Sequence, residues 1–224
     1  MAKTYKTGTR RSPLALKQAG EVLGSLRKYY PALKAEIVGM NTYGDKDKDT
    51  PISEIEGSDF FTREIDEAVL RGQSDFAVHS AKDLPDVLAQ GLMVAAITES
   101  IDPFDVLVAK DNLKLAEFKP GAKIGTSSLR RKQQLKNYRQ DLQIVDIRGN
   151  IFERLKLLEE TDLDGIVIAA AGLLRLGLGH RIAQRIPFAV LRPHPLQGAL
   201  ALVTRSSDKH LIELLSVLDV KRGT

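Results

Sequence analysis

The sequence predicts an α/β protein made of two small domains that face each other across a cleft. Short apolar strands alternate with segments of helical periodicity in the first half of the chain, and the alternation starts again from about Ile101. Strands that alternate with helices form largely parallel sheets with right-handed crossovers. The second half shows the same alternation of strands and helices, although its sequence does not repeat that of the first half. Two domains therefore fit the pattern better than one continuous sheet.

Pro13 suits the first turn of a helix, and apolar residues recur at helical spacing from Ala15 to Leu26. The elements expected in the first half are strand Tyr5 to Gly8, helix Pro13 to Tyr30, strand Ala35 to Met40, helix Phe60 to Arg71, strand Asp75 to Val78 and strand Met93 to Thr98. The polar segment Asn41 to Ser58 predicts a mobile surface loop.

The second half carries the same kinds of element. The expected strands are Val106 to Ala109, Lys123 to Gly125, Ile144 to Ile147 and Gly165 to Ala170, and the expected helices are Ser128 to Tyr138 and Asn150 to Leu158. A strand-like segment, Gln197 to Arg205, and a short helix, His210 to Leu218, are expected to return to the first domain. The predicted domains are therefore 1–98 with 197–224, and 99–196.

The composition is that of a globular protein without disulfides. The chain has 224 residues, of which 43% are hydrophobic and 28% charged, and it has no cysteine. This excludes disulfides, thiolate nucleophiles and cysteine-based metal sites, and the four histidines are too dispersed to predict a metal site. Without a membrane-spanning apolar run or a secretory signal at the N-terminus, we expect a cytoplasmic protein.

A polar run follows the predicted strand Asp75 to Val78. His79, Ser80, Lys82 and Asp83 stand where that strand ends. Ligands of open α/β sheets bind in the crevice beyond the carboxyl ends of the strands, so this run is placed for chemistry. The alternative is a solvated loop that happens to be polar.

Arginines gather at similar places. The segment Gly125 to Gln134 has capping residues Thr126 to Ser128 and then Arg130 and Arg131 in the first helical turn. Cations there oppose the helix dipole unless an anion occupies the site. Other arginines at or just past strand ends are Arg10, Arg148, Arg154 and Arg175. The alternative for these segments is a solvated basic face.

The formal net charge of +4 and the pI of about 9.2 indicate an anionic partner. Aromatic residues make up 5% of the chain and tryptophan is absent, which disfavours a nucleic-acid surface. The arginines suit a compact ligand with several carboxylates. Asp83, one acid among cations, suits positive charge that develops on the reacting group. The alternative for Asp83 is a structural salt bridge.

Six motifs resemble, in order, those of the porphobilinogen deaminase (hydroxymethylbilane synthase) family. They are TRRSPLALKQA, VHSAKDLP, IGTSSLRRKQQL, DIRGNIFERL, AAAGLLRLGL and LQGALALVTR, and the similarity runs from about Gly8 to Arg205. The resemblance implies two α/β domains of the type II periplasmic-binding kind. It implies that four molecules of porphobilinogen condense to linear hydroxymethylbilane with loss of ammonia, in tetrapyrrole and haem biosynthesis.

The resemblance also implies residue roles. By motif, Asp83 matches the catalytic aspartate, which contacts pyrrole N–H groups and stabilises a cationic intermediate. The residues expected to bind the carboxylates of substrate and dipyrromethane cofactor are Arg10, Ser12, Gln18, Ser80, Lys82, Thr126, Ser128, Arg130, Arg131, Arg148, Arg154 and Arg175. No metal is implied.

The sequence departs from the family pattern in three places. The family has a third, α+β domain with a cysteine that tethers the dipyrromethane; this chain stops soon after Leu218 without one, so we expect that domain to be absent. The usual Gly-Gly-Lys-Gly loop reads Glu56 to Asp59, which weakens the expected contact with an anionic ligand, and His194-Pro195 replaces the usual Val-Gly.

These departures leave alternatives open. The chain can act on porphobilinogen with a primer held non-covalently, as a monomer, or with a separate chain that supplies the missing domain. Alternatively it is a non-catalytic or truncated relative that binds pyrrole or tetrapyrrole carboxylates without turnover. A third reading is a small-anion sensor of solute-binding architecture.

Overall fold

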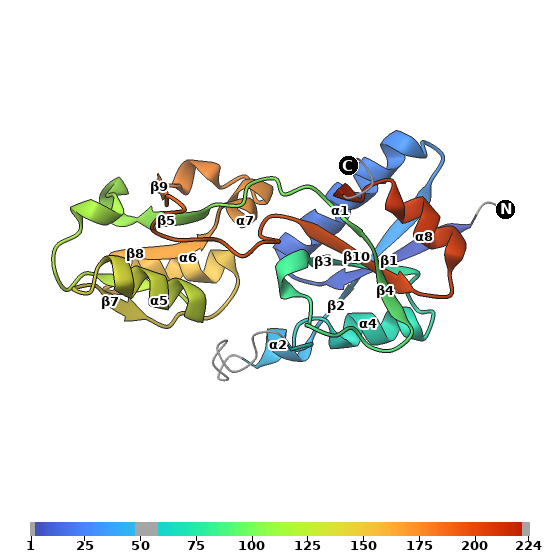
Figure 1. Ribbon diagram of the computed structural model, residues 1–224, viewed down its shortest axis with the longest axis horizontal. Coiled ribbons are helices and arrows are strands. Elements are labelled where there is room, and N and C mark those ends of the chain that lie inside the picture. The colour runs from blue at the N-terminus through green and yellow to red at the C-terminus, as the bar shows by residue number, and fades with distance from the viewer. Residues whose placement is uncertain (1–2, 48–57, 221–224) are drawn as a thin grey trace. The chain divides into compact units, whose positions relative to one another are not determined.

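The computed structural model describes residues 3–47 and 58–220 (Figure 1). The chain divides into two compact units. Within the described residues, unit 1 contains 3–47, 58–101 and 199–220, and unit 2 is Asp102–Gly198. The polypeptide therefore leaves unit 1 after Ile101 and returns to it at Ala199, whereas the sequence placed these crossings after residues 98 and 196.

Unit 1 is built on a five-stranded sheet with the order β2-β1-β3-β10-β4. Its strands are β1 (Thr4–Arg10), β2 (Lys34–Met40), β3 (Phe76–Ser80), β4 (Leu92–Ile97) and β10 (Leu200–Arg205). β1 runs parallel to β2 and β3, and β10 runs antiparallel to β3 and β4. The last strand of the chain is therefore inserted between strands of the first half.

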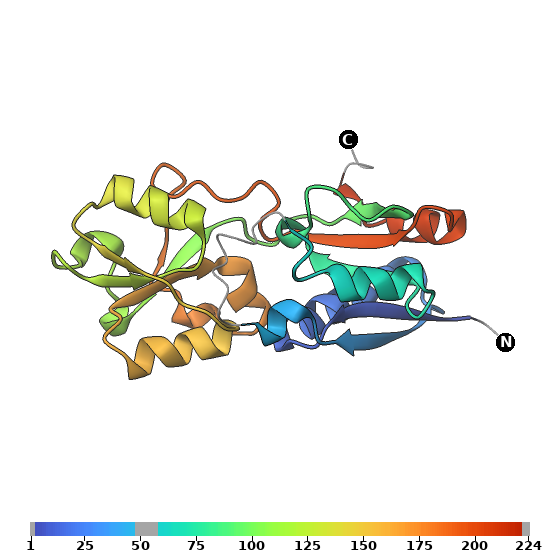
Figure 2. The same ribbon diagram turned by 90° about the horizontal axis from the view of Figure 1, so that it is seen from below.

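Helices cover both faces of this sheet (Figures 1 and 2). Helices α1 (Pro13–Tyr29) and α8 (Lys209–Ser216) bury apolar side chains against Phe76 and Val78 of β3. On the other face α4 (Arg63–Leu70) packs against Ala77. Successive residues of a strand point to opposite faces, so this alternation assigns each β3 side chain to one helix layer.

Unit 2 repeats the plan with the strand order β7-β6-β8-β5-β9. Its strands are β5 (Asp105–Ala109), β6 (Lys123–Gly125), β7 (Gln143–Val145), β8 (Gly165–Ala169) and β9 (Gln184–Arg185). Leu107 faces α5 (Leu129–Tyr138), whereas Val106 and Val108 face α6 (Ile151–Glu160) and α7 (Ala170–Arg175). Both units thus have the helix-covered α/β sheet that the alternating pattern predicted.

Short helices account for most differences from the expected elements. The predicted loop Asn41 to Ser58 contains helix α2 (Tyr43–Lys46), and residues 48–57 of that loop lie outside the described residues. Asp45 accepts hydrogen bonds from the backbone N and side-chain Oγ1 of Thr42 at 3.1 and 2.9 Å, which closes this turn. The 3₁₀ turns are η1 (Ala81–Asp83), η2 (Lys110–Asn112), η3 (Leu115–Glu117) and η4 (Gly179–Arg181).

Several element boundaries also differ from the expected ones. Helix α4 begins at Arg63, which leaves Phe60 and Phe61 in the preceding turn. Helix α7 starts directly after strand β8. It was not predicted because its first residues are small and apolar and so continue the apolar pattern of the strand in the sequence. Within residues 3–47 and 58–220, no helix combines the length and apolar character that a membrane crossing requires.

Candidate functional site

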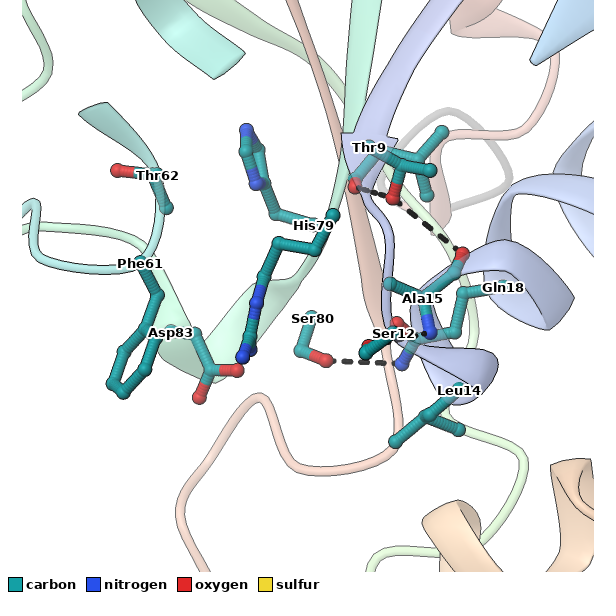
Figure 3. Close-up of a pocket in the computed structure, with 12 residues that line it drawn as sticks. Thr9, Ser12, Leu14, Ala15, Gln18, Phe61, Thr62, His79, Ser80 and Asp83 are labelled. Atoms are coloured by element: carbon teal, nitrogen blue, oxygen red, sulfur yellow. Dashed lines mark hydrogen bonds between the residues drawn. The ribbon is translucent and has the colours of Figure 1, made fainter. Parts of the chain in front are cut away.

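A pocket opens in unit 1 beyond the carboxyl ends of two parallel strands (Figure 3). The end of β1, the start of α1, the turn before α4, the end of β3 and the η1 turn contribute its walls. The lining residues are Thr9, Arg10, Ser12, Leu14, Ala15, Gln18, Phe61, Thr62, Val78, His79, Ser80 and Asp83. This is the location that an open α/β sheet favours for ligands.

Local hydrogen bonds hold the strand ends and α1 together. Thr9 Oγ1 donates to the Val78 carbonyl at 3.1 Å, which joins β1 to β3. The N-cap residue Ser12 accepts from the Ala15 backbone N at 3.3 Å. Gln18 Nε2 donates to Ser80 Oγ at 2.9 Å, so α1 and β3 present their polar side chains on one surface. Two predicted binding residues are thereby bonded to each other.

Arg10 is oriented by two neighbours in this unit. Its Nη2 and Nε donate to the carboxylate of Asp45, with Nε 3.2 Å from Oδ1. The guanidinium lies 4.7 Å from the centroid of the Phe61 ring. Burial alone would raise the pKa of Asp45, but Arg10 and the Thr42 hydrogen bonds outweigh it, so that pKa is lowered. Arg10 is therefore held before any ligand arrives, with Nη1 not bonded to any described residue.

The η1 turn carries two further predicted residues. Asp83 is half-buried and lines the pocket, and Lys82 precedes it in the same turn. Of the predicted residues in unit 1, the structure thus brings Arg10, Ser12, Gln18, Ser80 and Asp83 into one pocket. Lys82 is half-buried beside them in sequence but is not among the lining residues.

In unit 2 two adjacent arginines share one buried carboxylate. Asp105, at the start of β5, is fully buried. Arg131 Nε and Nη2 donate to its Oδ1 at 2.9 and 2.6 Å, and Arg130 Nη2 donates to Oδ2 at 2.7 Å. Gln197 Nε2 also donates to Oδ1 at 2.9 Å. Burial would raise the pKa of Asp105, yet the two guanidinium charges lower it overall.

In this cluster the carboxylate of Asp105 is the anion that compensates the two arginines in the first turn of α5. The sequence predicted that an external ligand would occupy that place, but Asp105 of the chain itself neutralises Arg131, which is 5% exposed. Arg131 Nη1 bonds the Val167 carbonyl at 3.3 Å, so all three nitrogens have internal partners. A direct contact of Arg131 with ligand stays a prediction. Arg130, less buried, also donates to the carbonyl of Arg192.

The other predicted residues of unit 2 lie in loops after strands or at helix ends. Ser128 is the N-cap residue of α5, and the buried Oγ1 of Thr126 has no hydrogen-bond partner among the described residues. Arg154 Nε donates to the Gly149 carbonyl at 2.8 Å, and Arg175 Nη2 donates to the Gly198 carbonyl at 3.0 Å. Arg148 is half-buried and follows Ile147.

The unusual residues noted in the sequence have local roles. Asp59, in the altered loop, pairs with Arg63 one helical turn later, with both N–O distances 2.7 Å. Ser58 Oγ accepts from the Phe60 backbone N at 3.3 Å, whereas Glu56 and Gly57 lie outside the described residues. His194 Nδ1 accepts from the Leu196 backbone N at 3.1 Å and closes the turn before Gln197.

Sequence reasoning missed several residues of these sites. Phe61 was expected on the buried face of a helix, and Asp45 in a mobile loop. Asp105 carried one usable signal, because an acid at the start of a fully apolar strand needs a buried partner. His79 was noted only as part of a polar run. Among the described residues, no three histidine, aspartate or glutamate side chains group as a metal site.

Comparison with solved structures supports the fold class. The methionine-binding protein MetQ matches with a TM-score of 0.57 at 14% identity, covering 96% of this chain and 89% of that one. The second substrate-binding domain of a putative amino acid ABC transporter from Streptococcus pneumoniae matches with a TM-score of 0.60 at 13% identity, covering 96% and 91%. At such identities the likeness shows the fold alone: two α/β domains with the type II periplasmic-binding fold.

Comparison of sequences gives the family. A family model described as "Porphobilinogen deaminase, dipyromethane cofactor binding domain" matches residues 5–213. Porphobilinogen deaminase of Natranaerobius thermophilus is 45% identical over 215 residues, 96% of this chain and 69% of the relative. That of Syntrophomonas wolfei is 46% identical over 214 residues, 96% of this chain and 70% of the relative. The chain belongs to the porphobilinogen deaminase family, which confirms the resemblance drawn from the motifs.

We predict that Asp105→Asn destabilises unit 2 strongly. It leaves two arginines with an uncompensated buried charge, which costs about 3–5 kcal/mol in the free energy of unfolding. Urea denaturation followed by circular dichroism measures it. Asp162→Asn, at an exposed ion pair with Lys123, is the matched control and should leave stability unchanged.

The effect of Asp105 should also depend on pH. Since its folded pKa is lowered, its stabilising contribution is full above the ordinary carboxyl range and is lost as pH falls through the folded value. The difference between wild type and Asp105→Asn should therefore shrink in acid. A difference that is constant from neutral to strongly acidic pH would contradict the pairing.

For the pocket, a double-mutant cycle of Arg10→Gln and Asp45→Asn should show that the two residues act together. The two single changes should cost more in sum than the double change, with a coupling of about 0.5–3 kcal/mol. Thermal unfolding of the four proteins measures this coupling. Additive single effects would mean that Arg10 does not depend on Asp45 for its position.

Proposed function

We propose that this chain is a hydroxymethylbilane synthase: it condenses four molecules of porphobilinogen into linear hydroxymethylbilane and releases ammonia. The observation that carries the proposal is that Asp83 lines one pocket with Arg10, Ser12 and Gln18. The chain also belongs to the porphobilinogen deaminase family. Porphobilinogen is a pyrrole with two carboxylate side chains and one aminomethyl group. A pocket with one carboxylate and a preoriented guanidinium is complementary to it.

The charge of each pocket residue determines its proposed role. Arg10, with its Nε and Nη2 held by Asp45, has Nη1 for a substrate carboxylate. Ser12, Gln18 and Ser80 offer polar contacts beside it. When the C–N bond of the protonated aminomethyl group breaks, neutral ammonia leaves with the bonding electron pair, and the methylene carbon and pyrrole ring share the positive charge. The carboxylate of Asp83 faces that charge and stabilises it.

The second reactant is a pyrrole with a free α-carbon. Its ring electrons form a bond to the cationic methylene carbon, and the α-carbon then loses a proton. Residues of unit 2 are proposed to bind the carboxylates of this partner. Two of the predicted residues can still take a ligand contact: Arg130 is only partly buried, and the buried hydroxyl of Thr126 has no partner among the described residues. An unsatisfied buried hydroxyl gains a hydrogen bond when a ligand supplies one.

The residues present fit a dipyrromethane in one respect and not in another. The arginines of unit 2 would hold its carboxylates. A dipyrromethane held in this way would be the starting acceptor for the condensation. A thioether tether needs a cysteine, and the 224 residues contain none. Any dipyrromethane on this chain alone is therefore proposed to bind without a cysteine bond.

The arginine sites by themselves support a second candidate function. A relative that keeps the arginine sites without a tether can bind pyrrole or tetrapyrrole carboxylates without turnover. We further propose that the protein acts in the cytoplasm as a monomer, with a separate chain that supplies a further domain as the alternative. The basic pI and the low aromatic content support a small acidic ligand rather than nucleic acid.

The first test is turnover. Purified chain, with and without added free dipyrromethane, should consume porphobilinogen and release ammonia, and Asp83→Asn should lower kcat by ~10²–10³-fold while porphobilinogen still binds. The exposed neighbour change Asp86→Asn is the matched control and should leave kcat unchanged. Binding without ammonia release under both conditions would support the second candidate instead.

The second test is the intact mass of the purified protein. We expect the mass of the polypeptide alone after denaturation, because no thiol is present to keep a dipyrromethane attached. Native-state mass spectrometry of the same sample can show a non-covalent complex. A denatured-state adduct of dipyrromethane mass would refute the argument that binding is non-covalent.

A further inference from the structure

A buried histidine–carboxylate pair lies in the wall of the unit 1 pocket. His79 Nε2 is 3.0 Å from Asp66 Oδ1, and the two side chains are 3% and 6% exposed. His79 comes from the end of β3, and Asp66 from α4. His79 is among the residues that line the same pocket as Asp83, and its imidazole lies between Thr62 and Thr9 in the view of Figure 3. The function proposed above does not yet use it.

The alternation of β3 explains this placement. Val78 and Ser80 point to the α1 face, where Ser80 meets Gln18. His79, between them, points to the α4 face and meets Asp66. The pair therefore ties the strand that leads into the η1 turn to the helix behind the pocket.

The pairing fixes which ring nitrogen carries the hydrogen. Among the described residues, His79 is the one side-chain partner of the Asp66 carboxylate. A buried carboxylate oxygen needs a donor, so Nε2 carries the hydrogen and donates it. The lone pair is then on Nδ1, which has no hydrogen-bond partner among the described residues. The carboxylate thereby holds the imidazole in one orientation and one tautomer.

We propose that His79 is a catalytic base for the condensation, with Asp66 as its positioning residue; this rests on the proposed function. After the new C–C bond forms, the attacking α-carbon still holds its hydrogen and its ring carries the positive charge. The C–H electron pair returns to the ring, and the proton passes to Nδ1. The resulting imidazolium is neutralised by Asp66 and gives the proton to the released ammonia, which becomes ammonium.

The other groups that line the pocket suit this step less well. Asp83 is needed as an anion opposite the developing cation. Arg10 has no basic lone pair near neutral pH, and the hydroxyl groups of Thr9, Ser12 and Ser80 are too weakly basic. Imidazole is the side chain that accepts and returns protons in the neutral range.

The experiment compares wild type with His79→Gln in turnover of porphobilinogen that carries deuterium on its free α-carbon. Glutamine reaches Asp66 with an amide N–H but has no basic nitrogen. We expect kcat to fall ~10²–10⁴-fold with KM little changed. We also expect a primary deuterium isotope effect that wild type lacks, because loss of the α-hydrogen becomes the slow step. Asp66→Asn should lower kcat less and show the same isotope effect.

Controls separate this role from a structural one. His180→Asn, at an exposed histidine of unit 2, should leave kcat and the isotope effect unchanged. Unchanged kcat in His79→Gln overturns the proposal. A lower kcat without the isotope effect also overturns it, because the pair then only supports the pocket wall.

A second measurement needs no variant to fold. Nitrogen NMR of ¹⁵N-histidine-labelled wild type should show His79 with hydrogen on Nε2 and a bare Nδ1, and the Nδ1 signal should shift when porphobilinogen is added. A hydrogen on Nδ1 instead would contradict the role of His79 as the base and leave the proposed function untouched. Absence of ammonia release by wild type contradicts the proposed function itself, and with it this step, so the two failures are distinguishable.

Discussion

The structure of both sites depends on one constraint: a guanidinium removed from water must find acceptors. In unit 2 the constraint is met by Asp105, whose two carboxylate oxygens receive Arg130 and Arg131 while Gln197 completes the set. Asp105 begins strand β5, so the position of the strand determines the position of both arginines. The start of α5 can then carry two cations despite the unfavourable helix dipole.

Unit 1 follows the same rule in a more open setting. Asp45 takes one edge of Arg10, and Phe61 covers its face. The charge is compensated and the side chain is ordered, which lowers the entropy lost when a carboxylate binds to the remaining nitrogen. For Arg10, internal pairing leaves Nη1 for the ligand contact that we propose, whereas all three nitrogens of Arg131 have internal partners. Internal pairing decides which part of the guanidinium meets the ligand.

Much of the fold and of the pocket was predictable from the sequence. The rest could not be predicted, and the reason is physical. Strand and helix periodicity gave the two α/β units, and the rule on strand ends placed Arg10, Ser80 and Asp83 at one edge. The partners of the arginines escaped prediction because they are far along the chain: Asp45 is 35 residues from Arg10, and Asp105 is 26 from Arg131. Such pairs are set by tertiary packing, which local patterns do not encode. Helix α7 escaped because its small apolar residues continue the strand pattern.

The claim that preoriented arginines bind the substrate with their remaining nitrogens is tested most directly by NMR of ¹⁵N-arginine side chains during titration with porphobilinogen. The account predicts that the Arg10 guanidinium signals shift to saturation. Signals of Arg139, whose guanidinium is held by Asp141 and the Phe118 carbonyl and which does not line the pocket, should stay in place. Unchanged Arg10 signals at saturating porphobilinogen would contradict the account.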